Sequence, residues 1–440
     1  MKRDLLEQLQ NWKTHPLRYP LVLRGARQVG KSWLVDEFGK SFEHIVKLNL
    51  EKDKAAATLF TETINIPALI QKIRYYTETP IEPGKTLLFI DEIQESENAL
   101  RTLRYFKEDF PQLHVIAAGS LLDFVIEKIG MPVGRVQFLH LYPLSFAEFL
   151  TAINRDDLRT MLLDENPTGV IHDKLLEFVK LYSLTGGMPA VVSAWLDYEN
   201  AYYCQEIQDT IIHTYQQDFN KYARSAQIEY VTTLFERIPD QLGKKFKYSE
   251  VDEHISIHHL KQALQLLRKA GIAYYCYHSS AQGLPLGASK NYKKFKVFFF
   301  DIGLAQRILG TQIKDWVIQS ALPQHNGAMA EQFVAQQLIA HSNPTAPAEL
   351  SYWHREARNS NAEVDFLIIK NGKIIPIEVK SGIKGKYRSL QLFLDYHPQS
   401  PFGVIISSGE YRERMDGYFS FPFYSLESLL SVNLEEIKQE

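Results

Sequence analysis

An eight-residue segment near the N-terminus has the composition and spacing of a loop that binds phosphate. Residues 25–32 read Gly-Ala-Arg-Gln-Val-Gly-Lys-Ser and follow a short apolar run at residues 21–23. The two glycines let the backbone turn tightly enough for several N–H groups to face one anion, and a helix that begins after the loop adds its positive end. In this pattern Lys31 reaches the β- and γ-phosphates of a nucleotide, and Ser32 holds Mg²⁺. We therefore expect nucleotide binding by every residue of this phosphate loop: Gly25, Ala26, Arg27, Gln28, Val29, Gly30, Lys31 and Ser32.

A second segment supplies the carboxylates that nucleotide hydrolysis needs. Residues 86–92 form an apolar run, too short for a helix, that ends in Asp91 and Glu92, which predicts a buried parallel strand. At the end of that strand Asp91 would meet the Mg²⁺ shell, and Glu92 would polarise the attacking water. The alternatives are that Glu92 caps the next helix and that the phosphate loop is an ordinary strand-to-helix turn. The two motifs in this order favour hydrolysis.

A third apolar run, at residues 114–118, precedes Gly119 and Ser120 and predicts another buried strand. A polar side chain at the end of that strand could sense the γ-phosphate. The alternative role of Ser120 is an N-cap, which is common for a serine before a helix.

A hairpin is predicted near the C-terminus, because an Asn-Gly turn at residues 371–372 separates two apolar runs. With these two residues in the loop, residue 370 pairs with 373. Counting outward places Asp365 opposite Glu378 and Glu363 opposite Lys380, and strand alternation puts all four on one face. Opposed Cβ atoms lie roughly 4.5–5.5 Å apart, where two carboxylates repel, so a cation should sit between them.

The chemistry of these four side chains suits a divalent metal. Oxygen ligands at this spacing fit Mg²⁺ or Mn²⁺, and Lys380 is near enough to orient a water or stabilise a phosphorane-like transition state. We therefore expect catalytic roles for Asp365, Glu378 and Lys380. The alternative is a cross-strand ion network in which Glu363, Asp365, Glu378 and Lys380 pair with one another.

Composition limits the partners and the compartment. The chain has 440 residues, a formal net charge of −3 and two cysteines, Cys204 and Cys276. It is long enough for several domains, has no global basic field to attract nucleic acid, and shows no disulfide framework. Local basic patches would have to hold any nucleic acid. In the absence of a secretory segment or a membrane-length apolar run, we expect a soluble cytoplasmic protein with no membrane partner, although signals read by specialised secretion systems would escape this reasoning.

Periodicity divides the chain into four parts. Strands alternate with helical stretches as far as about residue 145, which predicts a parallel sheet. Residues 146–237 have helical periodicity, and residues 238–310 contain a helix followed by two apolar strands, as in a winged helix. The expected fold class is α/β and multidomain, with domains at 1–145, 146–237, 238–310 and 320–440.

The winged-helix-like segment could contact nucleic acid. Ser256 is a good N-cap for a helix at 257–270, and strands are predicted at 272–277 and 296–300. Outward helix positions would reach a groove, and lysines would charge the wing. The helix positions are His258, Lys261, Gln262 and Gln265, and the wing lysines are Lys290, Lys293, Lys294 and Lys296. The equally weighted alternative is an internal packing module whose lysines are solvated.

The chain resembles the AAA+ ATPases, specifically a prokaryotic family that joins an AAA+ module to a C-terminal domain similar to restriction endonucleases. The residues that carry the resemblance are the phosphate loop, residues 87–92 and 117–120, Gly134-Arg135 with residues 141–146, and Tyr182 with residues 186–189. The resemblance implies a P-loop AAA+ core that binds ATP and Mg²⁺, a helical lid, a winged-helix-like segment and an α/β restriction-endonuclease-like domain.

The resemblance also implies roles for single residues. Asp365 followed by Glu378-x-Lys380 matches the PD-(D/E)XK arrangement of restriction-endonuclease-like nucleases, and Glu331 matches the helix-borne acid that such enzymes often place beside the metal. The implied metal ligands are Glu331, Asp365 and Glu378. AAA+ modules commonly complete the active site across a subunit interface, so an ATP-dependent homo-oligomer is implied. Arg135 would then be an arginine finger or sensor, or alternatively a structural ion-pair partner.

Three functional hypotheses follow. The first is an Mg²⁺-dependent ATPase coupled to a metal-dependent nuclease, using Mg²⁺ or Mn²⁺, that acts on nucleic acid, with DNA favoured over RNA. The alternative is an ATP-dependent regulatory switch whose C-terminal domain binds partners or DNA without cutting. A weaker third is a secreted or host-directed factor that acts on a phosphate target other than nucleic acid.

Overall fold

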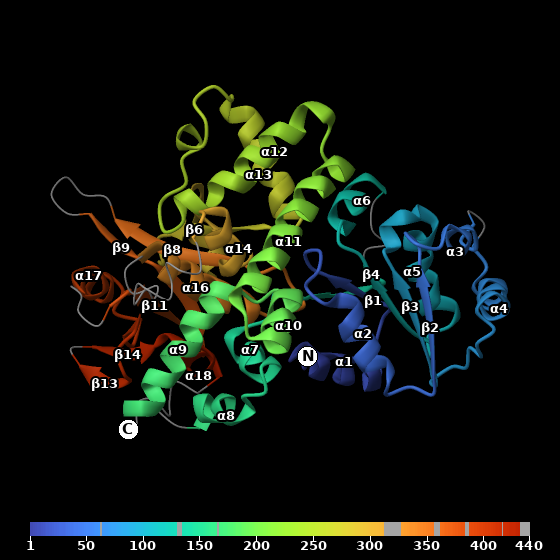
Figure 1. The fold of residues 1–440 in the computed structure, drawn as a ribbon, viewed down its shortest axis with the longest axis horizontal. Helices are drawn as coiled ribbons and strands as arrows, with labels where there is room; N and C mark the ends of the chain where they lie inside the picture. The colour runs from blue at the N-terminus through green and yellow to red at the C-terminus, as the bar shows by residue number, and fades with distance from the viewer. Residues whose placement is uncertain are drawn as a thin grey trace.

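The computed structural model describes residues 1–61, 64–129, 134–164, 167–311, 327–355, 361–382, 387–415 and 417–431. Within these ranges the chain forms three β-sheets with helices between and around them (Figure 1). The N-terminal strands, blue to teal, lie at one end of the view, and the orange and red C-terminal strands lie at the other. No helix in the described ranges is long and apolar enough to cross a membrane.

The N-terminal sheet is parallel, as predicted. Its strands run in the order β2-β3-β4-β1-β5 and are β1 (Leu21–Arg24), β2 (His44–Asn49), β3 (Thr86–Asp91), β4 (His114–Ala118) and β5 (Gln137–His140). Apolar side chains are buried on both faces because helices cover both. These helices are α1 (Leu5–Thr14), α2 (Lys31–Gly39), α3 (Lys54–Thr58), α4 (Ile66–Thr77), α5 (Glu97–Asp109) and α6 (Leu122–Ile129). All strands end at one edge of the sheet, where the phosphate loop follows β1.

Helices form the regular structure described between residues 146 and 237. They are α7 (Phe146–Ala152), α8 (Asp156–Asp164), α9 (Gly169–Thr185), α10 (Pro189–Tyr198), α11 (Ala201–Tyr222) and α12 (Ser225–Arg237). Two glycines between α9 and α10 allow Asp301 and Leu144 to approach the backbone of this turn closely. A Cβ on Gly186 would lie 2.1 Å from Asp301 Oδ1, and one on Gly187 would lie 2.3 Å from Leu144 O. The glycine pair that carried part of the resemblance is therefore a packing requirement.

The predicted helix and strands of the winged-helix-like segment form close to their expected positions. Helix α13 (Ile257–Lys269) begins after the N-cap Ser256, and β6 (Ala273–Ser279) and β7 (Lys290–Phe299) follow as a hairpin. The hairpin continues into the C-terminal part, because β6 pairs in parallel with β8 (Leu350–Arg355) in a sheet of order β7-β6-β8-β9, where β9 is Ala362–Val364. The boundary expected at residues 310–320 thus separates strands of one sheet.

Lys296 does not lie on a charged wing, in contrast to the prediction. Its exposed fraction is 0%, because this part of β7 lies between β6 and helix α16 (Gly327–Ala340). Lys290 is paired with Glu349, whereas Lys293 is exposed. The basic wing is therefore smaller than the sequence pattern indicates.

The C-terminal sheet contains the predicted hairpin. Its order is β10-β11-β12-β14-β13, and its strands are β10 (Phe366–Lys370), β11 (Lys373–Val379), β12 (Gly403–Ser407), β13 (Arg412–Met415) and β14 (Tyr418–Pro422). Helices α17 (Arg388–Tyr396) and α18 (Leu426–Ser431) belong to the same part of the chain. The predicted register is confirmed from the Lys370–Lys373 pair outward to Phe366 opposite Ile377.

Beyond Phe366 the predicted register is wrong. The chain bends at Asp365, and Glu363 pairs with His354 of β8 instead of lying opposite Lys380. The physical reason is competition between two ladders, since the residues before the bend join the sheet of β6 and β8. Asp365 still lies beside β11, because its Oδ2 accepts a hydrogen bond from Val379 N at 2.8 Å.

Three buried glutamines of α16 bind the backbone of other segments. Gln337 Oε1 accepts from Phe146 N at 2.7 Å, at the start of α7. Gln332 exchanges two bonds with Phe299 at the end of β7, at 2.9 and 2.7 Å. Gln336 makes similar contacts at the start of helix α14 (Ile302–Ile308). One helix therefore satisfies backbone groups of three elements that are distant in sequence.

Replacement of Gln336 by leucine tests this arrangement. Gln336 Oε1 accepts from Ile302 N at 2.7 Å, and Nε2 donates to Tyr182 Oη at 2.9 Å. Gln336→Leu keeps a similar volume but leaves the Ile302 N–H buried without a partner, so we expect the free energy of unfolding to fall by about 1–3 kcal/mol. The control, Gln391→Leu on the exposed face of α17, should change it by less than about 0.5 kcal/mol. Urea denaturation measures both, and equal losses would contradict the proposed importance of Gln336.

Candidate functional site

The phosphate loop connects β1 to α2, as predicted. Glycine is required at both ends: a Cβ on Gly25 would lie 2.2 Å from Leu141 O, and Gly30 has a φ of +97° as the N-cap of α2. Lys31 Nζ donates to Gly25 O at 2.9 Å and to Ala26 O at 2.8 Å, which holds the ammonium against the loop. Burial lowers the pKa of Lys31 to about 8. The loop thus presents a cation and a helix N-terminus to one small volume.

Ser32 and Asp91 lie together, as their predicted shared role requires. Ser32 Oγ donates to Asp91 Oδ2 at 2.9 Å, and Asn49 Nδ2 donates to the same oxygen at 3.3 Å. Burial raises the pKa of Asp91 above its ordinary value. A hydroxyl and a carboxylate are hard oxygen ligands of the kind that Mg²⁺ takes. These residues therefore fit Mg²⁺, which would neutralise charge on the phosphates of a bound nucleotide.

Glu92 lies at the same edge of the sheet. It directly follows β3 with a φ of +50°, a backbone conformation that non-glycine residues adopt at a cost and that clusters at functional sites. Its Oε2 accepts from Gln94 Nε2 at 2.6 Å. A Cβ on Gly119 would lie 2.0 Å from Gln94 Oε1, so Gln94 joins the ends of the adjacent strands β3 and β4. Ser120, buried beside Gly119, is thus brought to the edge that carries Glu92.

Arg135 lies away from this edge. It precedes β5, whereas the phosphate loop follows β1, and the two strands are parallel neighbours. Arg135 is therefore at the amino edge of the sheet, where its Nε lies 3.7 Å from Glu108 Oε1 and its side chain is 53% exposed. Contact of Arg135 with a nucleotide on its own chain's phosphate loop, one form of the prediction, is not compatible with this position. A contribution to a neighbouring subunit stays a prediction.

Two arginines fix the outside of the loop. The buried Arg3 donates to Val29 O and Tyr142 O, both at 2.7 Å, and so ties the loop to the segment after β5. The Arg27 side chain points to α11, where its Nη1 donates to both carboxylate oxygens of Asp218 at 2.7 and 2.8 Å. Sequence reasoning missed Arg3 and Gln94, because neither belongs to a motif with a recognisable spacing.

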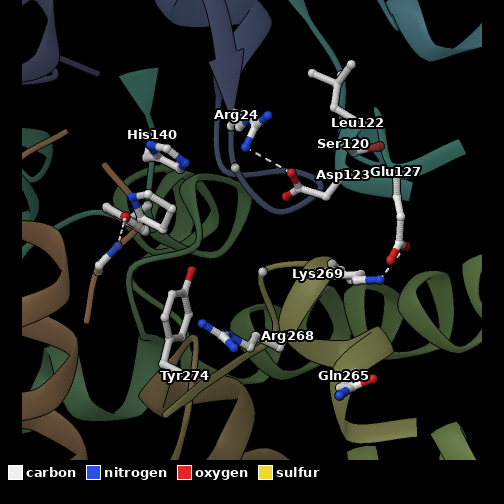
Figure 2. A pocket seen from close by; sticks show the side chains of 17 residues that line it. Arg24, Ser120, Leu122, Asp123, Glu127, His140, Gln265, Arg268, Lys269 and Tyr274 are labelled. Carbon is white, nitrogen blue, oxygen red and sulfur yellow. Dashed lines mark hydrogen bonds and ion pairs between the residues drawn. The ribbon is translucent and has the colours of Figure 1, made fainter. Parts of the chain in front are cut away.

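A cavity of about 440 Å³ lies beside the loop (Figure 2). Gly25 and Ser120 line it from the sheet edge, and Gln265, Arg268 and Lys269 line it from α13. Lys269 is paired with Glu127 of α6, which bridges the two sides. Gln265 therefore faces the N-terminal domain, although we expected it to face a nucleic-acid groove. The other outward positions, His258 and Lys261, are exposed, and Gln262 is half-buried.

Two of the three carboxylates predicted to bind a metal near the C-terminus, those of Glu331 and Asp365, contact a lysine instead. Lys296 Nζ lies 2.6 Å from Glu363 Oε1, 2.9 Å from Glu331 Oε2 and 3.5 Å from Asp365 Oδ1. Sequence reasoning placed this lysine on the wing. A signal was present, since Lys296 stands in the otherwise apolar run 295–300 and such a lysine must find buried partners.

Glu378 and Lys380 complete this charged cluster. Lys380 Nζ donates to Glu378 Oε1 at 2.6 Å, whereas Glu378 Oε2 is buried and accepts no hydrogen bond within the described part of the chain. Burial raises the pKa of both Glu331 and Glu378 to about 8. In the described ranges, no group of three or more His, Cys, Asp or Glu residues is arranged to hold a metal ion. The predicted ligands are thus paired with ammonium groups: Glu331 and Asp365 with Lys296, and Glu378 with Lys380. Lys384 and Lys386, which follow Lys380 in the sequence and could provide phosphate contacts, lie outside the described ranges.

Comparison with known protein families assigns the N-terminal part. Residues 17–150 match a family model described as an AAA domain. Residues 176–315 and 326–426 match two further models, each described as a domain of unknown function. The AAA-domain match, together with the paired phosphate loop and carboxylates, supports an ATPase-like P-loop domain of the AAA+ type. None of these descriptions mentions a nuclease.

Individual relatives are distant. A protein of Haemophilus influenzae described as uncharacterized is 22% identical over 437 residues, which cover 94% of each chain. The Walker-type ATPase of Pyrococcus abyssi is 14% identical with a TM-score of 0.44, covering 70% of this chain and 95% of that one. The ORC1 protein of Aeropyrum pernix, solved in complex with DNA, is 12% identical with a TM-score of 0.30, covering 70% and 90%.

Lys31→Ala should abolish detectable ATP binding. The loop loses the ammonium held at Gly25 O and Ala26 O, which is the cation nearest to an incoming phosphate chain. The matched control is Lys47→Ala on β2, because Lys47 is exposed and pairs with Asp36. Binding of a fluorescent ATP analogue measures both variants. Wild-type affinity in Lys31→Ala would contradict the assignment.

Glu92→Gln should bind ATP and Mg²⁺ but hydrolyse ATP slowly. The substitution leaves Lys31, Ser32 and Asp91 in place and removes only the carboxylate that would polarise the attacking water. We expect turnover to fall by about 10²–10⁴-fold with little change in ATP affinity. Phosphate release and ATP binding, measured separately, distinguish the two effects. Unimpaired turnover would remove Glu92 from the mechanism and leave the binding site intact.

Proposed function

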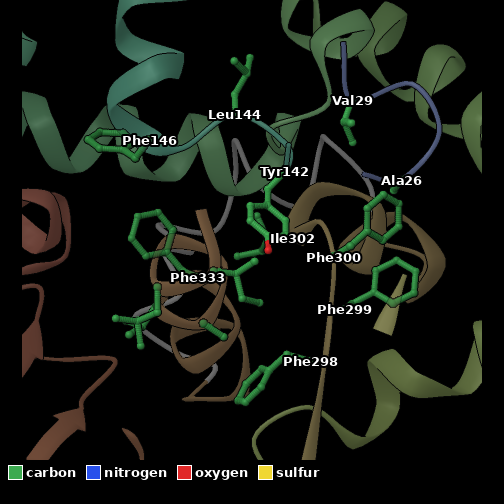
Figure 3. Packing of buried hydrophobic residues seen from close by; sticks show 14 of the residues in the cluster. Ala26, Val29, Tyr142, Leu144, Phe146, Phe298, Phe299, Phe300, Ile302 and Phe333 are labelled. Atoms are coloured by element: carbon green, nitrogen blue, oxygen red, sulfur yellow. The ribbon is translucent and has the colours of Figure 1, made fainter. Parts of the chain in front are cut away.

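We propose that this protein is an ATP-dependent switch: the N-terminal domain binds and hydrolyses Mg²⁺-ATP, and the nucleotide state alters how the C-terminal part is held. The observation that carries the proposal is a buried apolar cluster that includes both the phosphate loop and the end of β7. Ala26 and Val29 of the loop belong to the same buried apolar cluster as residues 298–300, at and just beyond the end of β7 (Figure 3). The same strand carries Lys296 into the charged cluster.

In this proposal the phosphate loop is the part of the chain on which a bound nucleotide acts first. Lys31 is hydrogen-bonded to Gly25 O and Ala26 O, and an ATP phosphate chain would compete for the same ammonium. Ala26 is buried, and a Cβ on Gly271, directly after α13, would lie 3.4 Å from Ala26 N. Close-packed interiors transmit such displacements because there is little empty volume to absorb them. A shift of the loop is therefore expected to reach both α13 and β7.

The strand β7 is in turn bonded to helix α16. The backbone N–H and C=O of Phe299 form hydrogen bonds with the side-chain amide of Gln332 in α16. Lys296, three residues earlier and roughly 10 Å along the strand, contacts Glu331 of the same helix. These contacts support the proposal, because they would make β7 and α16 move together.

Metal-dependent cleavage of nucleic acid is the competing proposal. In its favour, Asp365, Glu378 and Lys380 lie in one buried cluster with the residue types that such chemistry uses. Against it, Lys296 lies among the carboxylates that would bind the metal. We therefore favour a C-terminal domain that binds a partner, with DNA as one candidate, without cutting it. Assembly into an ATP-dependent homo-oligomer, with Arg135 acting in trans, belongs to the same proposal.

Amide hydrogen exchange tests the switch. ATP and Mg²⁺ added to Glu92→Gln, which should retain bound ATP, are expected to change exchange in residues 290–299 and 327–340, and to change nothing there in Lys31→Ala. Helix α4, on the opposite face of the N-terminal sheet, provides the internal reference. A change confined to residues around the phosphate loop would contradict the switch while leaving the ATPase assignment intact.

Incubation with labelled DNA and RNA tests the competing proposal. The switch predicts no cleavage that depends on both Lys380 and a divalent metal, whether Mg²⁺ or Mn²⁺ is supplied. Cleavage by the wild type that is lost in Lys380→Ala would favour the nuclease instead.

A further inference from the structure

The cluster around Lys296 contains four carboxylates and two ammonium groups, which we call the lysine cluster: Lys296, Glu331, Glu363, Asp365, Glu378 and Lys380. Three of the carboxylates come from separate elements, α16, β9 and the bend before β10. All three point their oxygens at one nitrogen. An ammonium has three N–H donors and no acceptor, so its donor number matches three carboxylates.

A divalent metal does not fit the same volume while Lys296 remains there. Mg²⁺ needs near-octahedral oxygen ligands at about 2.0–2.1 Å, and a second cation beside it would be repelled. The carboxylate oxygens around Lys296 Nζ lie instead at 2.6–3.5 Å, which is the range of charge-assisted hydrogen bonds and ion pairs. The arrangement is that of a completed ammonium site.

Lys296 is held in place by its backbone as well as by its charge. Cys276 of β6 is its partner in the strand ladder, and Lys245 forms a bridge on its other side. The Tyr352 ring lies 5.5 Å from the ammonium. The ladder fixes the backbone of Lys296, and its three ion pairs and complete burial hold the ammonium inside the cluster.

We propose that Lys296 is the permanent internal cation of the lysine cluster, where it pairs with Glu331 and Asp365, two of the three expected metal ligands, and that it acts as a positioning residue. The cluster then uses no divalent metal, and its carboxylates serve to clamp β7 to α16 and to the start of the C-terminal sheet. The role of β7 as a clamped strand deepens the proposed switch and rests on that proposal. Whether the lysine cluster binds a divalent metal does not depend on ATP.

Manganese binding tests the proposal without disturbing Lys296. The protein is Lys31→Ala, in which the ATP site is disabled, and the matched variant is Lys31→Ala/Asp365→Asn. Bound Mn²⁺ is counted by electron paramagnetic resonance, and the shift in Tm on adding Mn²⁺ is measured for both. We expect the same bound Mn²⁺ and the same Tm shift in both. An Mn²⁺ site or Tm rise in Lys31→Ala that is lost with Asp365→Asn would overturn the proposal.

A double-mutant cycle tests the clamp. Lys296→Met should lower Tm by several degrees, whereas Lys293→Met, an exposed lysine of the same strand, should leave it nearly unchanged. Glu331→Gln should recover part of the loss caused by Lys296→Met, because it removes one uncompensated carboxylate. Equal Tm values for Lys296→Met and Lys293→Met would overturn the role of Lys296. If Lys296→Met does not fold, the loss supports the clamp, and the manganese comparison decides the metal question with Lys296 intact.

The outcomes separate this inference from the proposed function. Failure of the switch appears as unchanged hydrogen exchange with ATP, whereas failure of the internal-cation proposal appears as Asp365-dependent binding of Mn²⁺ in a protein that cannot bind ATP. Neither result can be mistaken for the other, because they concern different sites and different ligands.

Discussion

Hydrogen bonds from the side-chain amides of α16 are the constraint on which the arrangement of the chain depends. Gln337 satisfies Phe146 N, Gln332 satisfies both backbone groups of Phe299, and Gln336 satisfies Ile302 N. These backbone groups are buried, and each would be left unsatisfied if α16 moved away. The start of the helical middle, the end of β7 and the start of α14 thus share one set of polar contacts, and a relative displacement of any of them strains the others.

The strand β7 shows how that constraint connects chemistry at two places. Its end belongs to the same buried apolar cluster as Ala26 and Val29 of the phosphate loop, and its middle carries Lys296 into the lysine cluster. An extended strand is stiff along its length and is hydrogen-bonded to its neighbours, so its two ends move together. In the proposed switch, this strand would connect the charged cluster in the C-terminal part to the loop that is expected to hold ATP.

The sequence was sufficient to predict those features whose conformation depends on residues close by in the chain. The phosphate loop, the placement of Asp91 and Glu92 after β3, the α13 cap at Ser256 and the hairpin register from Phe366 to Lys370 follow from local turn chemistry and alternation. Reasoning failed where distant segments compete: Glu363 pairs with β8, and Lys296 is buried because α16 covers it. Arg3 and Gln94 belong to no local sequence pattern. Whether Arg135 can reach the phosphate loop depends on the edge of the sheet at which β5 begins, and this follows only from the strand pairing.

The bond between Gln337 and Phe146 spans 191 residues of sequence, and this separation has a consequence for biosynthesis. A chain that emerges from the ribosome N-terminus first can assemble its parallel sheet early, but the start of α7 has its partner only after α16 has been made. Contacts of such high sequence separation form late and slow the final docking of domains. The nascent protein therefore passes through a stage in which a phosphate loop already exists while β7 and α16, the elements expected to respond to it, are still absent.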